Sequence, residues 1–133
     1  MPRSPTALLL VLLCLRLPAM ELIEDDSPAA LTALGNEATQ SLQYDRAIGL
    51  YKRALATNPT YIYAIFNLGV VHQQRQEPSL ARSYYDQVLD LDPDHAQALN
   101  NNGIIAFQQQ DYRLAIKFFN AAANVADNPP GDN

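Results

Sequence analysis

The sequence is short of the residues that form disulfides and metal sites. Its only cysteine is Cys14, so no internal disulfide can form, and cysteine usage does not report the redox compartment. The two histidines, His72 and His95, stand far apart, and neither has a second histidine or a cysteine close to it in the sequence. Because zinc and similar metals need several such ligands together, we expect no metal ion and no other cofactor.

Positive charge is also scarce. Nine lysines and arginines stand against fourteen aspartates and glutamates, which gives a net charge of −5. This balance disfavours nucleic acid and anionic lipid as partners, because both attract basic surfaces. The sequence also lacks a glycine-rich phosphate loop and a serine nucleophile elbow, so we expect a protein that is not an enzyme. With 48% hydrophobic residues, the 133-residue chain can form one folded domain.

The longest unbroken hydrophobic run covers residues 7–15 and follows Arg3. As a helix it would be about 14 Å long at ~1.5 Å per residue, against roughly 30 Å of bilayer hydrocarbon, so we expect no stable transmembrane span. Leu17 and Ala19 then offer a pattern for cleavage by a signal peptidase. The layout predicts a signal peptide at residues 1–19 and export to the periplasm or the extracellular space.

Two other interpretations of this segment stay open. Cys14 resembles the modified cysteine of a bacterial lipoprotein, although Leu13 stands where such sites require a small residue. Alternatively, Met20 is the true start, and the protein is cytoplasmic. In each case residues 20–27 form an acidic leader, which we expect to be a solvated arm.

The rest of the chain repeats itself with a period of 34 residues. Three residue types share this register: Gly35, Gly69 and Gly103; Ala47, Ala81 and Ala115; and Pro59 and Pro93. A fixed period of this length is typical of stacked supersecondary units, each of which buries its apolar face against its neighbours. We assign the units to residues 28–61, 62–95 and 96–129, with a short tail at 130–133.

Each unit has the pattern of two amphipathic helices. In the first unit, apolar residues recur at steps of three and four and predict helices at about residues 28–41 and 45–58. Ser27 followed by Pro28 is a helix start signal, and Asn58 followed by Pro59 is a helix boundary. The glycines and alanines let the paired helices approach closely, and we expect Tyr51, Tyr85 and Phe119 to fill the space one turn further along.

These positions carry a resemblance to a known family. Leu34-Gly35, Ala47, Tyr51, Ala54 and Pro59, with their counterparts in the next two units, resemble the tetratricopeptide repeat family from residue 28 to about 129. The resemblance implies an all-α, right-handed solenoid of three helix-turn-helix repeats. It also implies a concave groove, lined mainly by the first helix of each repeat, that commonly binds peptides. In departures from the family pattern, Ile65 and Leu99 replace an aromatic residue, and Asn102 replaces a leucine.

The family's best-known groove clamps an acidic C-terminal peptide with two asparagines and three basic residues. Asn36 and Asn67 match the asparagines, but Thr32, Gln97 and Asn101 occupy the three basic places. Without cations, a terminal carboxylate loses its charge-assisted hydrogen bonds. We therefore do not expect a partner of the chaperone-tail class.

Amide side chains and two aromatic residues dominate the positions that the register places in the groove. Amides both donate and accept hydrogen bonds, and aromatic rings supply apolar area, so the groove predicts a neutral, partly apolar peptide or protein segment as the partner. The alternative is that these amides form an ordinary solvated helix face. The positions are Asn36, Gln40, Tyr63, Phe66, Asn67, Val70, Gln73, Gln74, Gln97, Asn100, Asn101 and Ile104.

The third repeat raises a second hypothesis. Only four residues follow Pro129 in the sequence, fewer than the extra solvating helix of many family members, so we expect Ile116, Phe119 and Ala123 to lack a cover. The sequence thus favours an interaction module that acts as a scaffold or assembly factor. The alternatives are a self-associating structural protein that uses the third repeat to form homo-oligomers, and an accessory subunit of an enzyme complex.

We expect His72 to be a core or hydrogen-bonded residue.

Overall fold

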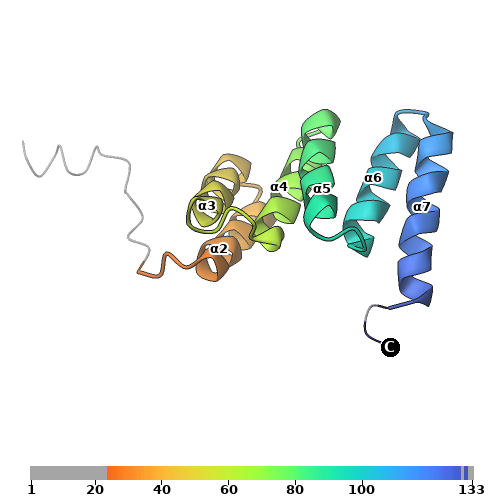
Figure 1. The fold of residues 1–133 in the computed structure, drawn as a ribbon. Helices are drawn as coiled ribbons and strands as arrows, with labels where there is room; N and C mark the ends of the chain where they lie inside the picture. Colours follow the sequence, from red (N-terminus) through yellow and green to blue (C-terminus); the bar gives the residue numbers. More distant parts are fainter. Residues whose placement is uncertain (1–23, 130, 132–133) are drawn as a thin grey trace, which may run out of the picture.

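A computed structural model describes residues 24–129 and 131, so the expected signal peptide and its alternatives lie outside the described residues. The described chain folds into six α-helices that form three consecutive pairs (Figure 1). The helices are α2 (Pro28–Gln40), α3 (Tyr44–Thr57), α4 (Ile62–Gln74), α5 (Pro78–Leu91), α6 (Ala96–Gln108) and α7 (Tyr112–Asp127). These bounds agree with the helices expected in the first unit to within one residue.

The helix pairs stand side by side in one row (Figure 1). Within each pair the two helices pack on each other, and α3 and α5 also pack on α4 and α6 of the following pair. The described residues contain no strand. The chain is therefore an all-α solenoid of helical repeats, as the 34-residue period predicts.

The ends of the helices follow from local signals in the sequence. The Ser27 hydroxyl accepts a hydrogen bond from the backbone N–H of Ala30 at 3.2 Å and caps α2, with Pro28 at the first helical position. The second helix of every pair ends at a polar residue that precedes a proline. These residues are Asn58, Asp92 and Asn128, and the proline cannot donate to a continuing helix.

The turn inside each pair is closed by a residue in the left-handed conformation. Leu42, Gln76 and Gln110 have φ angles of 58°, 60° and 63°. In the second pair, the Gln76 N–H donates to the Gln73 carbonyl at 3.0 Å and the Glu77 N–H donates to the His72 carbonyl at 2.9 Å. This pattern of two bonds is a Schellman motif, in which glycine is the preferred residue at the left-handed position.

We expect the substitution Leu42→Gly to raise the free energy of unfolding by roughly 0.5–1 kcal/mol. The left-handed conformation costs a non-glycine residue about 1–2 kcal/mol, which exceeds the entropy that glycine loses on folding. The Leu42 side chain is 71% exposed, so its removal sacrifices little packing. Urea unfolding followed by circular dichroism measures the change. As a control, Lys52→Gly on the exposed side of α3 should destabilise by about 1 kcal/mol, and equal losses for both variants would contradict the argument.

Aromatic side chains of the second helices lie against glycines of the first helices. Tyr51 and Tyr85 are almost completely buried in the two core clusters. A Cβ atom on Gly35, Gly69 or Gly103 would lie 2.4, 2.5 or 2.6 Å from a ring carbon of Tyr51, Tyr85 or Phe119, respectively. Since non-bonded carbon atoms are optimally ~3.5–4.0 Å apart, only glycine fits beneath each ring.

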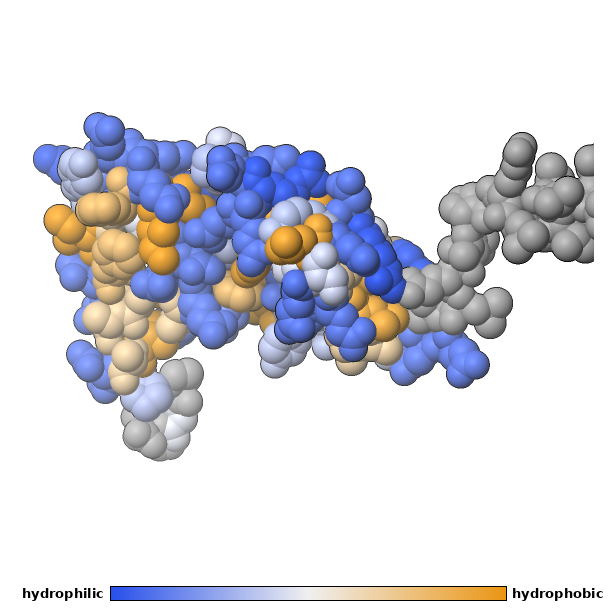
Figure 2. Space-filling model, turned by 180° about the vertical axis from the view of Figure 1, so that it is seen from behind, coloured by the Kyte–Doolittle hydropathy of each residue, from blue (hydrophilic) through white to orange (hydrophobic). Residues whose placement is uncertain are grey.

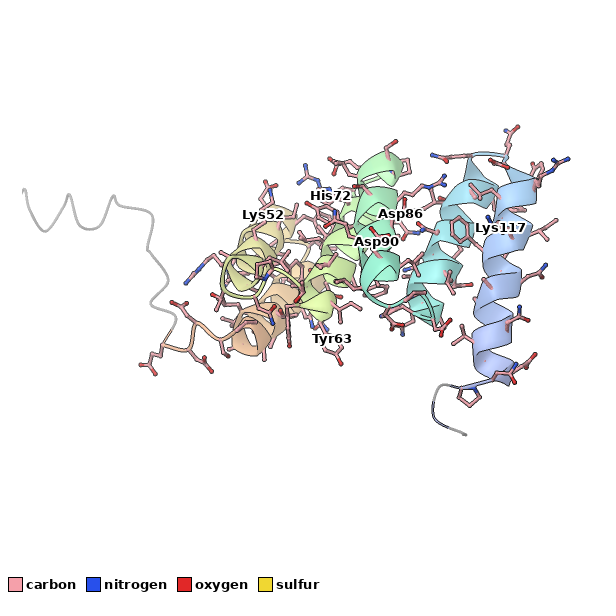
Figure 3. The ribbon with its side chains drawn as sticks, in the orientation of Figure 1. Lys52, Tyr63, His72, Asp86, Asp90 and Lys117 are labelled. Carbon is pink, nitrogen blue, oxygen red and sulfur yellow. The ribbon has the colours of Figure 1, made fainter. Side chains whose placement is uncertain are left out.

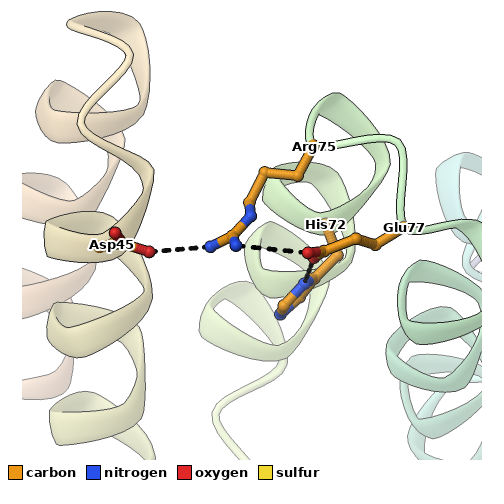
Figure 4. A network of polar contacts seen from close by, with 4 residues as sticks. All are labelled: Asp45, His72, Arg75 and Glu77. Carbon is orange, nitrogen blue, oxygen red and sulfur yellow. Dashed lines mark hydrogen bonds and ion pairs between the residues drawn. The ribbon is translucent and has the colours of Figure 1, made fainter.

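A polar network ties the first pair to the second (Figure 4). The buried His72 ring lies 2.6 Å, through Nδ1, from Glu77 Oε2 and stacks on Tyr84 with a ring-centroid distance of 5.4 Å. Arg75 contacts Glu77 at 3.3 Å and reaches across to Asp45 at 2.8 Å. His72 is thus a hydrogen-bonded core residue, as expected, and the network links α3 to the turn between α4 and α5.

The third pair is joined to the second through a polar side chain that departs from the family pattern. Asn102 is fully buried, and its Nδ2 donates to Asp86 Oδ1 on α5 at 2.8 Å. Its Oδ1 has no hydrogen-bond partner among the described residues. Where Leu68 supplies an apolar contact one repeat earlier, the third repeat uses a hydrogen bond between helices.

A candidate peptide groove on the first helices

An amide pair at the centre of the candidate groove is held in a fixed orientation by a buried tyrosine. The Tyr51 hydroxyl donates to Asn36 Oδ1 at 2.8 Å, and Asn67 Nδ2 donates to the same oxygen at 2.9 Å. Thr39 lies 3.1 Å from the Tyr51 hydroxyl and donates to the Gly35 carbonyl. The two asparagines that the register places together, one from α2 and one from α4, are therefore in direct contact.

This arrangement decides which atoms of the amide pair remain available to a ligand. Because Asn36 Oδ1 accepts two hydrogen bonds, the Asn36 amide nitrogen is left as a donor. Asn67 donates one amide hydrogen to Asn36, and the Asn67 Oδ1 remains available as an acceptor. A donor and an acceptor side by side match the C=O and N–H groups of an extended peptide backbone.

Burial raises the pKa of both supporting tyrosine hydroxyls. Desolvation raises the pKa of Tyr51, and a hydrogen bond with Thr39 acts in the opposite direction. Desolvation also raises the pKa of Tyr85 to about 12, against an opposing hydrogen bond with Asn101. The Tyr85 hydroxyl donates to Gln73 Oε1 at 2.8 Å. Both hydroxyls thus remain donors at neutral pH and orient amides on the first helices.

An open pocket of about 450 Å³ lies between the second and third repeats. Its apolar wall includes Phe66, whose ring centroid lies 5.5 Å from that of Tyr85 and 5.2 Å from that of His95. His95 in turn caps α6, because its Nδ1 accepts a hydrogen bond from the Ala98 N–H at 3.2 Å. The described residues that line the pocket are Phe66, Ala96, Gln97, Asn100, Asn101 and Ala122.

None of the predicted groove residues is fully buried, so all can reach solvent or a ligand. Those that are exposed are Asn36, Gln40, Tyr63, Gln74, Gln97 and Asn100. Those that are partly buried are Phe66, Asn67, Val70, Gln73, Asn101 and Ile104. Tyr63 is 64% exposed, packs on Tyr61 with ring centroids 5.5 Å apart, and projects away from α4 (Figure 3).

Sequence reasoning missed two residues of the pocket. Ala96 begins α6. Ala122 comes from α7, a second helix of a pair, whereas the resemblance implies a groove lined mainly by first helices. The register contained a signal, because Ala122 stands at the position of Ala54 and Val88, which are both buried between repeats. Small side chains at two walls leave room for a ligand side chain.

The positions matched to basic clamp residues do not act together. Thr32 is buried, and its hydroxyl has no hydrogen-bond partner among the described residues. Gln97 and Asn101 line the pocket with neutral amides. Among the residues that the structure describes, the lining of the pocket therefore includes no charged side chain.

A second hollow, of about 490 Å³, lies on α5 and beside the end of α6, outside the predicted groove. It is slightly larger, but exposed polar side chains of α5 form most of its wall, including Asp86, which is already bonded to Asn102. The part of the chain that the structure describes has no cluster of residues suited to a metal ion, and none of its helices is long and apolar enough to cross a membrane. The groove is the better candidate site because apolar and amide groups converge there.

The three residues expected to lack a cover on the third repeat are not equivalent. Ile116 is 59% exposed and Ala123 is also exposed. Phe119 is partly buried, because its ring occupies the space over Gly103. Its main contact lies inside its own repeat.

Comparisons with known proteins agree with this architecture. The family model described as tetratricopeptide repeat matches residues 66–133, and a TPR repeat model matches residues 35–76. No curated protein matches the chain by sequence. A crystal structure of MamA matches with a TM-score of 0.73 and 25% identity over 77% of this chain and 61% of MamA, so this chain spans about three fifths of that relative.

Two further solved structures share the fold. The Sgt2 TPR domain from Aspergillus fumigatus matches with a TM-score of 0.70 and 23% identity, over 79% of this chain and 70% of that domain. The second TPR of Spaghetti (RPAP3), bound to the HSP90 peptide SRMEEVD, matches with a TM-score of 0.68 and 20% identity. That match covers 73% of this chain and 90% of the Spaghetti domain.

Proposed function

The chain belongs to the tetratricopeptide repeat family, and on that premise we propose that it binds an extended segment of a partner protein across α2, α4 and α6. In this role it is a non-enzymatic scaffold or assembly factor. The observation that carries the proposal is the Asn36–Asn67 pair, because Tyr51 orients its free donor and acceptor for a peptide backbone. The Spaghetti domain, which has the same fold, is bound to a peptide.

The bound segment is neutral and carries one apolar side chain. The pocket beside Phe66 takes that side chain, and Asn100, Gln97 and Asn101 bond to the backbone on either side of it. An acidic tail such as SRMEEVD would meet neutral amides in this pocket, on a chain whose net charge is −5. It would therefore gain no charge-assisted hydrogen bonds.

The test is differential capture of partners by the chain and by two double variants. Asn67→Ala with Asn100→Ala removes two amides of the groove, and we expect partner binding to weaken at least about tenfold, or ~1.4 kcal/mol. Gln87→Ala with Asp90→Ala changes two exposed residues of α5 and is expected to bind normally. Phe66 is left in place, because it packs on Tyr85 and its truncation would also disturb the core.

Captured partners are then divided into short peptides, and affinities are measured by isothermal titration calorimetry. The proposal requires a neutral peptide that binds the chain and the α5 variant alike and the groove variant weakly. Synthetic SRMEEVD is expected to show no saturable binding. Tight binding of SRMEEVD, or equal capture by both double variants, would refute the proposed groove chemistry.

We also propose that the protein is exported and that residues 1–19 are removed as a signal peptide. The support is the short apolar run at residues 7–15 followed by the small residue Ala19. Intact-mass measurement of the native protein tests this idea. A mature chain that begins at Met20 and comes from an extracytoplasmic fraction is expected, whereas a chain that retains residues 1–19 would oppose cleavage.

A further inference from the structure

The third repeat exposes a surface that is covered in the first two repeats. Tyr51 and Ala54 are 1% and 0% exposed and lie in one cluster with residues of α4. Tyr85 and Val88 are both 0% exposed and lie in one cluster with residues of α6. Their counterparts in the third repeat, Phe119 and Ala122, are only partly buried. Within residues 24–129, no following helix covers them.

This surface, here called the terminal face, is strongly apolar. It comprises Phe107, Tyr112, Ile116, Phe119 and Ala123. Phe107, Tyr112 and Ile116 are 58%, 54% and 59% exposed, and the Phe107 and Tyr112 ring centroids lie 5.4 Å apart. Figure 2 shows hydrophobic residues gathered at this end of the molecule, beside the C-terminal segment. Exposed apolar patches of this kind usually mark interfaces.

Ile116 shares its register position with two side chains that lie near junctions between repeats. Ile48 stands at the same position in the first repeat and packs in the same cluster as Tyr84 of the second. Arg82 stands there in the second repeat, and its guanidinium lies 5.9 Å from the ring centroid of Phe118 in the third. Arg82 therefore meets the next repeat, Ile48 packs against a cluster that includes residues of the next repeat, and Ile116 occupies the same position in the third repeat.

The helices α4 and α6 cover the corresponding faces of the first and second repeats, so they show which kind of helix fits such a face. In α4, the buried residues Ala64, Leu68 and Val71 pack on the first repeat. In α6, Ala98 and Ile105 occupy the first and last of these positions and pack on the second repeat. The occupant is thus a helix with a small residue at position i and larger residues at i+4 and i+7, which lie on one helix face.

We propose that the terminal face binds such an amphipathic helix from a partner protein, as a continuation of the interface between repeats, with an acidic residue near the end of that helix. The reason for expecting an acidic residue in the partner helix is Arg113. It is exposed and stands at the register position of Asp45, which binds Arg75, the residue that follows α4, across the first junction at 2.8 Å. At the terminal face this position carries the cation Arg113 in place of the anion Asp45. The residue of the partner helix that corresponds to Arg75 lies eleven positions after its small residue, and it should therefore be aspartate or glutamate.

A second copy of the chain is a poorer occupant, because its first helix lacks the required pattern. At the three positions α2 carries Ala30, Leu34 and Glu37, and Glu37 is exposed. Docking α2 on the terminal face would place a carboxylate where Val71 and Ile105 are fully buried. Burial of an unpaired charge is strongly unfavourable, so head-to-tail stacking of copies is disfavoured.

The test uses a labelled peptide with the sequence of residues 61–75, in which glutamate replaces the final arginine. We expect saturable binding to the full chain by fluorescence anisotropy. Phe107→Glu with Ile116→Glu should weaken it at least about tenfold. Both side chains are more than half exposed, so circular dichroism should show an unchanged fold. The groove variant Asn67→Ala with Asn100→Ala should bind the peptide normally, which separates this site from the groove.

A charge exchange checks the docking register. The peptide that keeps arginine at its final position should bind the chain about two- to fivefold more weakly than the glutamate peptide, as expected for an exposed ion pair. The order of affinities should reverse for the Arg113→Asp variant. The inference is overturned by absent binding or by binding that ignores Phe107→Glu with Ile116→Glu. It is also overturned if sedimentation shows a homodimer that the same variant dissociates, since a second copy would then be the occupant.

Discussion

Replacement of Tyr85 by alanine should lower the free energy of unfolding by about 3–5 kcal/mol. The Tyr85 side chain is 0% exposed, its ring lies against Gly69, and its hydroxyl donates to Gln73 at 2.8 Å. It belongs to the cluster that joins the second and third repeats, so its removal leaves a cavity at the junction. Since small domains have only about 5–15 kcal/mol of stability, the loss should be readily visible in urea unfolding.

The third repeat contains a natural control for this prediction. Phe119 occupies the same register position over Gly103 but has no hydroxyl and is only partly buried, because the terminal face is not covered. Phe119→Ala should therefore cost roughly half as much, in proportion to the smaller area removed from water. Equal losses for the two variants would mean that the junction between repeats contributes no more than packing within one repeat.

Substitution of Gly69 by alanine should also destabilise, by about 1–2 kcal/mol. The new Cβ would lie 2.5 Å from Tyr85 Cε1, and the ring is packed on all sides. Overpacking of this kind costs about 1–3 kcal/mol, which outweighs the gain of up to ~1 kcal/mol that alanine brings to a helix interior. Chemical unfolding of the variant measures the net effect.

Gly49 provides the matched control, and a double variant tests the cause. Gly49 lies within α3, and a Cβ there would meet nothing within 4 Å, so Gly49→Ala should stabilise by about 0.5–1 kcal/mol. In a Tyr85→Ala background the ring is gone, and Gly69→Ala should become neutral or stabilising. A destabilisation that persists in that background would show that contact with the ring is not the reason for glycine at this position.

Much of the fold could be predicted from the sequence, because its determinants are local. The 34-residue period corresponds to one helix pair, and the cap at Ser27 and the boundary at Asn58-Pro59 lie beside single helices. The observed helices agree with these signals. The glycine–aromatic pairs are only sixteen residues apart, as in Gly69 and Tyr85, so each forms within one helix hairpin. Family membership follows from the same register.

The register also placed the candidate groove on the first helices, but it could not show how the amides are used. Only the packing of α2, α3 and α4 decides that Asn36 Oδ1 is occupied by Tyr51 and Asn67. A sequence pattern gives the helix face on which an amide lies. It does not give the rotamer that determines whether the amide presents a donor or an acceptor.

The sequence by itself determined the repeat, the helices and the glycine beneath each ring, because those features depend on contacts within one hairpin. The tertiary structure alone decided that Ala122 of α7 helps to form the Phe66 pocket and that Ile116 is open while Phe119 lies over Gly103. These features depend on how successive hairpins are rotated against each other. That rotation results from the packing of many side chains at the junctions between repeats, which no single position in the sequence specifies.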